Sequence, residues 1–210
     1  MRSYLYVPGA SFAATAADAV IAQPDGSAAP GSEEAHAGPD IWVMIDAGEQ
    51  SHRELRSVVR SGLTGVCVAG ARSASELAAL GAALAGAEEG VGLPVGRIAV
   101  MPVLETAAAV LGAAEIARAP RVARLHLGER ALCDALRIRA SPDERELLWL
   151  RSMVVAASAA AGIGAPIGDV CADQDMFGPS ADWLRRLGFA GRACAGEGQV
   201  LMANEIFANG

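Results

Sequence analysis

Short apolar runs recur along the whole chain, each bounded by glycine or by acidic residues. There are eight of them, at residues 4–7, 18–22, 41–45, 65–69, 98–104, 124–127, 165–170 and 191–195. Each run has the length of a buried strand, and helical patterns separate most of them. The clearest helical patterns cover residues 51–62, 73–87, 106–119 and 141–162. Strands alternating with helices predict a parallel sheet covered by helices.

Eight such units predict an α/β fold of the closed (β/α)₈ TIM-barrel type, for which about 200 residues is the short end of the range. Residues 23–40 are rich in Pro, Gly and Ser, so the second βα unit is expected to be shortened. No internal repeat or linker is visible, and residues 1–210 are predicted to form a single domain. The alternative is an open doubly wound sheet, but no G-x-G-x-x-G follows the first strand.

Two helix starts have a specific chemical signal. Thr106 is the expected N-cap of the helix over residues 106–119. Ser141 and Pro142, followed by acidic residues, are the expected start of the helix over residues 141–162.

Composition excludes several classes of function. The chain is 52% hydrophobic and 20% charged, so it can bury a sizeable core. Its net charge of -7 argues against nucleic acid as a partner. All 17 basic residues are Arg, and the absence of Lys excludes Schiff-base catalysis, lysine-anchored pyridoxal phosphate and a Walker-type phosphate loop.

The four cysteines are widely spaced and form no C-x-x-C pair. We expect four buried thiols in a reducing, cytoplasmic compartment. The first residues contain one Arg, and Pro8 and Gly9 interrupt their apolar run, which argues against a secretory signal. No apolar run approaches the ~20 residues of a membrane span, so no membrane association is expected.

Acidic residues follow four of the predicted strands. They are Asp46, Glu105, Glu129 and Asp169. Barrel enzymes place their sites at the carboxyl ends of the strands, and hard cations such as Mg²⁺ or Mn²⁺ take oxygen ligands. The alternative is that each acid caps or begins a helix, where the helix dipole favours negative charge.

Five segments carry a resemblance to a known family. They are RSYLYVPG near the start, PVLETAAAVLGAAEIA, LHLGERALCDAL, LGFAGRA and NEIF. In this order they resemble the citrate lyase β-subunit family, a branch of the HpcH/HpaI aldolase superfamily, over nearly the whole chain. The segment around Glu105 is the most specific part.

The resemblance implies a (β/α)₈ barrel that binds Mg²⁺ or Mn²⁺ and makes or breaks a carbon–carbon bond. The implied substrates are citryl-CoA, malyl-CoA or a similar hydroxyacyl-CoA, which give an acyl-CoA thioester and a 2-oxo acid. The resemblance also implies a homo-oligomer, commonly a trimer. Relatives continue into further C-terminal helices, which this chain is expected to lack because it stops at Gly210.

Carried over residue by residue, the resemblance is uneven. Glu105 falls on the first metal ligand, in the pattern P-x-x-E-T, and Arg2, Pro8, Gly9 and Gly128 fall on substrate-binding positions. The second metal ligand, an Asp, is Ala131 here, and the substrate-clamping Arg is Met44. Further departures are Asp25 as the remnant of D-L-E-D, Ala69-Gly70 for P-K, and Ala195-Gly196-Glu197 for I-H-P, although Arg192 retains a basic residue before the last of these.

These departures leave two hypotheses open. Glu105, Glu129 and Asp46 form a rebuilt metal site in a metal-dependent carbon–carbon lyase. Alternatively, Arg130 pairs with Glu105 or Glu129, and the chain is a non-catalytic acyl-CoA or carboxylate binding protein, or a partner of an active paralogue. Of the three histidines, only His126 is expected to face the barrel interior, as a satisfied core or interface residue with no acid–base role.

Large apolar side chains gather in the last third of the chain, at Phe177, Trp183, Phe189 and Phe207. They predict either a subunit interface or the filling of the barrel.

Overall fold

A computed structural model describes residues 2–8, 15–23, 38–48 and 55–209 of the chain. Eight strands form a closed barrel in sequence order, and every neighbouring pair, including the first with the last, is parallel. The strands are β1 Ser3–Pro8, β2 Ala19–Gln23, β3 Asp40–Asp46, β4 Leu63–Ala69, β5 Ala99–Leu104, β6 Arg124–Leu127, β7 Gly164–Gly168 and β8 Gly191–Cys194. The predicted TIM-type barrel and its eight strands are confirmed.

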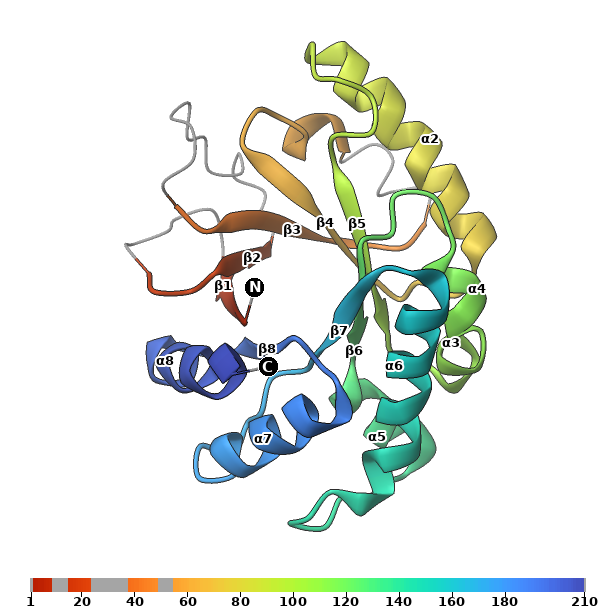
Figure 1. The fold of residues 1–210 in the computed structure, drawn as a ribbon. Coiled ribbons are helices and arrows are strands. Elements are labelled where there is room, and N and C mark those ends of the chain that lie inside the picture. Colours follow the sequence, from red (N-terminus) through yellow and green to blue (C-terminus); the bar gives the residue numbers. More distant parts are fainter. Residues whose placement is uncertain (1, 9–14, 24–37, 49–54, 210) are drawn as a thin grey trace.

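Helices lie around the outside of the barrel (Figure 1). They are α2 Ala74–Gly90, α3 Ala107–Leu111, α4 Ala113–Ala117, α5 Glu129–Leu136, α6 Leu148–Ala161, α7 Phe177–Leu187 and α8 Glu197–Ile206, with short 3₁₀ segments at Arg145–Leu147 and Phe207–Asn209. Residues 55–58 are also helical. The predicted shortening of the second βα unit falls on residues 24–37, outside the described part of the chain.

Two of the predicted helices have different bounds. The helix over residues 106–119 is interrupted at Gly112, although Thr106 caps its start by accepting a hydrogen bond from the Ala109 N–H at 3.1 Å. Residues 141–144 do not begin α6, because Glu144 takes a left-handed conformation with φ 49°. The Ser141 hydroxyl instead donates to Glu146 and Asp143, which forms a separate turn.

The core has two parts, and the alternation along each strand decides which side chains enter which part. Val66 and Val68 of β4 face the helices, whereas Cys67 between them faces the barrel interior. The interior holds Tyr4, Ala19, Ile21, Trp42, Cys67, Met101 and Ile167. Gly65 makes room for Trp42, because a Cβ at Gly65 would lie 2.4 Å from the indole ring.

The large apolar residues of the last third lie mostly in the core. Phe177, Phe189 and Phe207 are buried between helices and barrel wall, whereas Trp183 of α7 is 47% exposed. Three of the four therefore pack within the chain, outside the barrel interior. The four cysteines are free thiols, and Cys67 and Cys194 are buried as expected, whereas Cys133 and Cys171 are only half-buried.

Candidate functional site

Glu105 and Gly128 lie together at the carboxyl end of the barrel, where β5 and β6 end. The backbone N–H of Gly70, directly after β4, donates a hydrogen bond to Glu105 Oε2 at 2.7 Å. A Cβ at Gly128 would lie 2.7 Å from Glu105 Cγ, so only glycine leaves space for the Glu105 side chain here. Two neighbouring loops thus fix the carboxylate that the family resemblance predicts to be the first metal ligand.

Glu129 points away from this carboxylate. It is 8% exposed and accepts a hydrogen bond from Arg151 Nε of α6 at 2.6 Å. Arg151 also pairs with Glu144 at 2.8 Å. Burial raises the pKa of Glu129, and the Arg151 guanidinium opposes that shift. Of the two partners considered for Arg130, Glu105 and Glu129, the second is wrong, because the Glu129 side chain faces the helices and meets Arg151 there.

The pair belongs to a buried polar network that crosses three helices. Glu144 accepts a hydrogen bond from the Ser180 hydroxyl at 2.8 Å, and that hydroxyl accepts one from Arg192 at 3.0 Å. Arg192 is 1% exposed, lies over the Phe177 ring, and donates to the carbonyl of Asp169 at 2.9 Å. Arg192 therefore supports the end of β7 from behind the barrel wall.

Asp169 follows β7 and completes this side of the rim. Its Oδ2 accepts a hydrogen bond from the Arg130 N–H in the first turn of α5, at 3.1 Å. Its Oδ1 accepts one from the Val170 N–H at 2.8 Å. The acid thus caps a neighbouring helix, which was the alternative to a metal-binding role.

Tyr6 and His126 lie beneath these carboxylates. Burial raises the pKa of the Tyr6 phenol, as do Cys67, Asp169 and Glu105, while Arg130 lowers it. The Tyr6 and His126 ring centroids are 6.3 Å apart. His126 faces the interior as expected, but it is not satisfied: both ring nitrogens are buried and lack a hydrogen-bond partner within the described structure.

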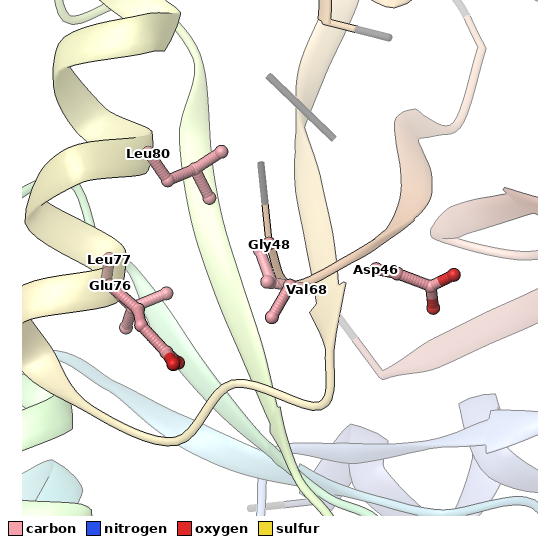
Figure 2. Close-up of a pocket in the computed structure, with 7 residues that line it drawn as sticks. Asp46, Gly48, Val68, Glu76, Leu77 and Leu80 are labelled. Atoms are coloured by element: carbon pink, nitrogen blue, oxygen red, sulfur yellow. The ribbon is translucent and has the colours of Figure 1, made fainter. Parts of the chain in front are cut away.

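Asp46 lies at the end of β3 with an exposed side chain. It lines a cavity of about 20 Å³ between the ends of β3 and β4 and helix α2, together with Ala47, Gly48, Val68, Glu76, Leu77 and Leu80. In Figure 2 its carboxylate points away from Leu77 and Leu80. The space admits about one water molecule, too little for a substrate.

The remaining predicted substrate-binding residues are not brought together. Pro8 ends β1 at the rim, and Gly9 lies outside the described residues. Arg2 precedes β1 at the opposite end of the barrel, where it pairs with Asp18 and donates to the Asn204 carbonyl. A role for Arg2 in substrate binding stays a prediction that its position does not support.

The side chains that could ligate a metal ion limit how such an ion would be held. Within residues 2–8, 15–23, 38–48 and 55–209, no group of three His, Cys, Asp or Glu side chains is placed to hold one. The rebuilt site of Glu105, Glu129 and Asp46 is thus not assembled there. Mg²⁺ is often bound through one or two carboxylates, with water and substrate oxygens completing its shell. Glu105 fits an ion that a chelating ligand helps to hold.

Comparisons with known proteins agree with the fold. A family model described as HpcH/HpaI aldolase/citrate lyase matches residues 47–196. Citrate lyase subunit beta of Leuconostoc mesenteroides subsp. cremoris is 27% identical over 74% of this chain and 52% of its own length. A citrate lyase subunit beta-like protein of Deinococcus radiodurans is 29% identical over 99% of this chain and 80% of its own. The chain thus spans about half the length of the first relative.

Solved structures show the same fold. The citrate lyase beta subunit of Mycobacterium tuberculosis, complexed with oxaloacetate and magnesium, has a TM-score of 0.72 at 20% identity, covering 98% of this chain and 96% of that one. RipC from Yersinia pestis has a TM-score of 0.77 at 17% identity, covering 98% and 94%. In the described part of this chain, no helix has both the length and the apolar character to cross a membrane.

Proposed function

Because this chain belongs to the HpcH/HpaI aldolase/citrate lyase family, we propose that it is a metal-dependent carbon–carbon lyase. Its substrate is a hydroxyacyl-CoA of the citryl-CoA or malyl-CoA kind, and its products are an acyl-CoA thioester and a 2-oxo acid. The proposal rests on the family and on one structural observation, the fixed position of Glu105.

A metal ligand has to have a fixed position, and the position of the Glu105 carboxylate is fixed by its neighbours. The Gly70 N–H orients one oxygen of the carboxylate at 2.7 Å, and the missing Cβ of Gly128 leaves room for its stem. Both contacts come from backbone, which cannot rotate away as a side chain can. A preorganised carboxylate of this kind loses little conformational freedom when it binds an ion.

The described residues support an ion shared between Glu105 and the 2-oxo acid, which offers a carboxylate oxygen and a keto oxygen. A bound Mg²⁺ or Mn²⁺ would stabilise the negative charge that develops on such an oxygen during cleavage. Ala131 supplies no second carboxylate, so we expect the ion to bind weakly without the acid.

A Mn²⁺ titration followed by EPR tests this arrangement. We expect little bound Mn²⁺ with protein alone and at least tenfold tighter binding with saturating oxaloacetate. Glu105→Gln should abolish the enhancement, whereas Glu115→Gln, at an exposed position of α4, should leave it intact. Cleavage of citryl-CoA and malyl-CoA then identifies the substrate. Absence of Mn²⁺ binding at millimolar concentration with oxaloacetate present would contradict the proposal.

A second candidate function is favoured by the position of Glu129. With Ala131 in place of the second ligand and Glu129 paired to Arg151, the chain would bind a carboxylate or an acyl-CoA without cleaving it, or serve an active paralogue. In that case oxaloacetate or acetyl-CoA binds without Mn²⁺ and nothing is cleaved. Recovery of turnover in Ala131→Asp combined with Met44→Arg would support this account, and robust cleavage by the native chain would end it.

We also propose that residues 1–210 act as one barrel domain in a cytoplasmic homo-oligomer, a trimer by family resemblance. Four free thiols support the reducing compartment, and the exposed Trp149 and Trp183 on neighbouring helices α6 and α7 support an assembly. Light scattering should give about three times the chain mass of 21.4 kDa. A monomer at micromolar concentration would contradict the trimer.

A further inference from the structure

His126 is the buried polar residue nearest the rim that nothing in the described structure satisfies. It is 0% exposed, and neither Nδ1 nor Nε2 has a hydrogen-bond partner. Buried polar side chains are almost always hydrogen-bonded, and an unmade bond costs about 1–3 kcal/mol. Three other interior groups of the described residues are unpartnered. Tyr4 Oη and Arg124 Nη1 lie at the starts of their strands, at the far end of the barrel, and Trp42 Nε1 lies on β3, four residues before Asp46.

The strand register places His126 on the strand next to Glu105, two residues deeper in the barrel. His126 of β6 pairs with Val103 of β5, and Leu127 pairs with Leu104. Side chains alternate along a strand, so the next residues on the same face are Gly128 and Glu105. Two residues span about 6–7 Å along a strand, which is the length of a small organic acid.

The groups around His126 suit a polar ligand. Tyr6 faces it across the interior at 6.3 Å with the rings tilted by 43°. Asp169 raises the pKa of His126, but burial outweighs it and lowers the pKa, so the ring is neutral. A neutral imidazole offers one N–H donor and one acceptor nitrogen, and it adds no charge to a site that already has two carboxylates.

We propose that His126 is a substrate-contacting residue, whose ring N–H donates a hydrogen bond to a carboxylate or carbonyl oxygen of the 2-oxo acid bound beside Glu105. The contact deepens the proposed function and rests on it. The acid lies between Glu105 above and His126 below, with the Tyr6 ring closing one side. Analogues without an oxygen at that point leave the imidazole unpaired and bind more weakly.

Histidine NMR tests the contact in the intact chain. The three histidines give few ring nitrogen signals, and comparison with His126→Asn assigns those of His126. We expect oxaloacetate, added with Mn²⁺ replaced by diamagnetic Mg²⁺, to shift the His126 ring signals. The shift is measured on the wild-type chain. The variant serves only to assign the signals and does not have to bind the ligand.

Calorimetry of oxaloacetate binding supplies the second readout. His126→Phe keeps an aromatic ring of similar size and removes the N–H donor, so the dissociation constant should rise about tenfold. If oxaloacetate binds the wild-type chain but the His126 signals stay in place, an internal water satisfies the ring; the contact is then refuted and the proposed function stands. If oxaloacetate does not bind at all, both fail.

Discussion

Arg151 neutralises two buried carboxylates at once, and its removal should be among the most damaging single changes in the barrel. Its side chain is 2% exposed and contacts Glu129 at 2.6 Å and Glu144 at 2.8 Å. Arg151→Met keeps the volume of the stem but leaves both acids without their cation. Breaking a buried ion pair in this way costs about 3–5 kcal/mol, against a total stability of about 5–15 kcal/mol for a typical domain.

Urea unfolding followed by circular dichroism measures the loss. Arg186→Met is the matched control, since Arg186 pairs with Asp182 on the surface of α7 and is 67% exposed. Surface pairs of this kind contribute about 0–1 kcal/mol. Combining Arg151→Met with Glu129→Gln should cost less than the two single changes added together, because the second change removes one unpaired charge. A loss for Arg151→Met no larger than that for Arg186→Met would refute the argument.

Three further changes test other contacts. Glu88 is 0% exposed; burial alone would raise its pKa, but hydrogen bonds from a guanidinium and two backbone N–H groups hold the pKa below its usual value. The ionised Glu88 carboxylate therefore stabilises the fold above about pH 4.3, and this stabilisation is lost as the pH falls through the folded-state pKa. Between pH 5 and pH 3 the urea midpoint should therefore fall more in wild type than in Glu88→Gln. Gly128→Ala puts a Cβ 2.7 Å from Glu105 Cγ, and should cost about 1–3 kcal/mol in urea unfolding and abolish the oxaloacetate-dependent Mn²⁺ signal in EPR. Gly65→Ala puts a Cβ 2.4 Å from the Trp42 ring and should cost a similar amount, with a changed tryptophan emission spectrum.

The strands could be predicted because a barrel strand is covered on both faces. Each therefore reads as an apolar run, and only its ends were uncertain: the run at residues 4–7 became β1 Ser3–Pro8, and that at 165–170 became β7 Gly164–Gly168. The helix bounds were less visible, because they depend on single backbone conformations. The left-handed Glu144, which delays α6, has no signal in the composition around it.

The site could be predicted only where local sequence determines it. Glu105 follows an apolar strand and lies at the rim as expected, but the donor that fixes it, the Gly70 N–H, lies 35 residues earlier. Arg151 was missed as the partner of Glu129, although a lone arginine within the apolar stretch LLWLRSMVV indicates a buried partner. Which acid it meets depends on how α5 and α6 pack.

The local fold after β6 explains why Glu129 cannot replace the missing ligand. His126 faces the barrel interior, and Gly128 follows it on the same face, beside Glu105. Glu129, one residue later, begins α5 and is held against α6 by Arg151, so a change in how the chain leaves β6 would be needed to turn it inward. That change would break the contact of Glu129 with Arg151 and move Gly128 away from Glu105. The described residues thus leave Glu105 as the acid suited to an ion, so the gain in Mn²⁺ affinity caused by oxaloacetate is the quantity that separates a lyase from a non-catalytic relative.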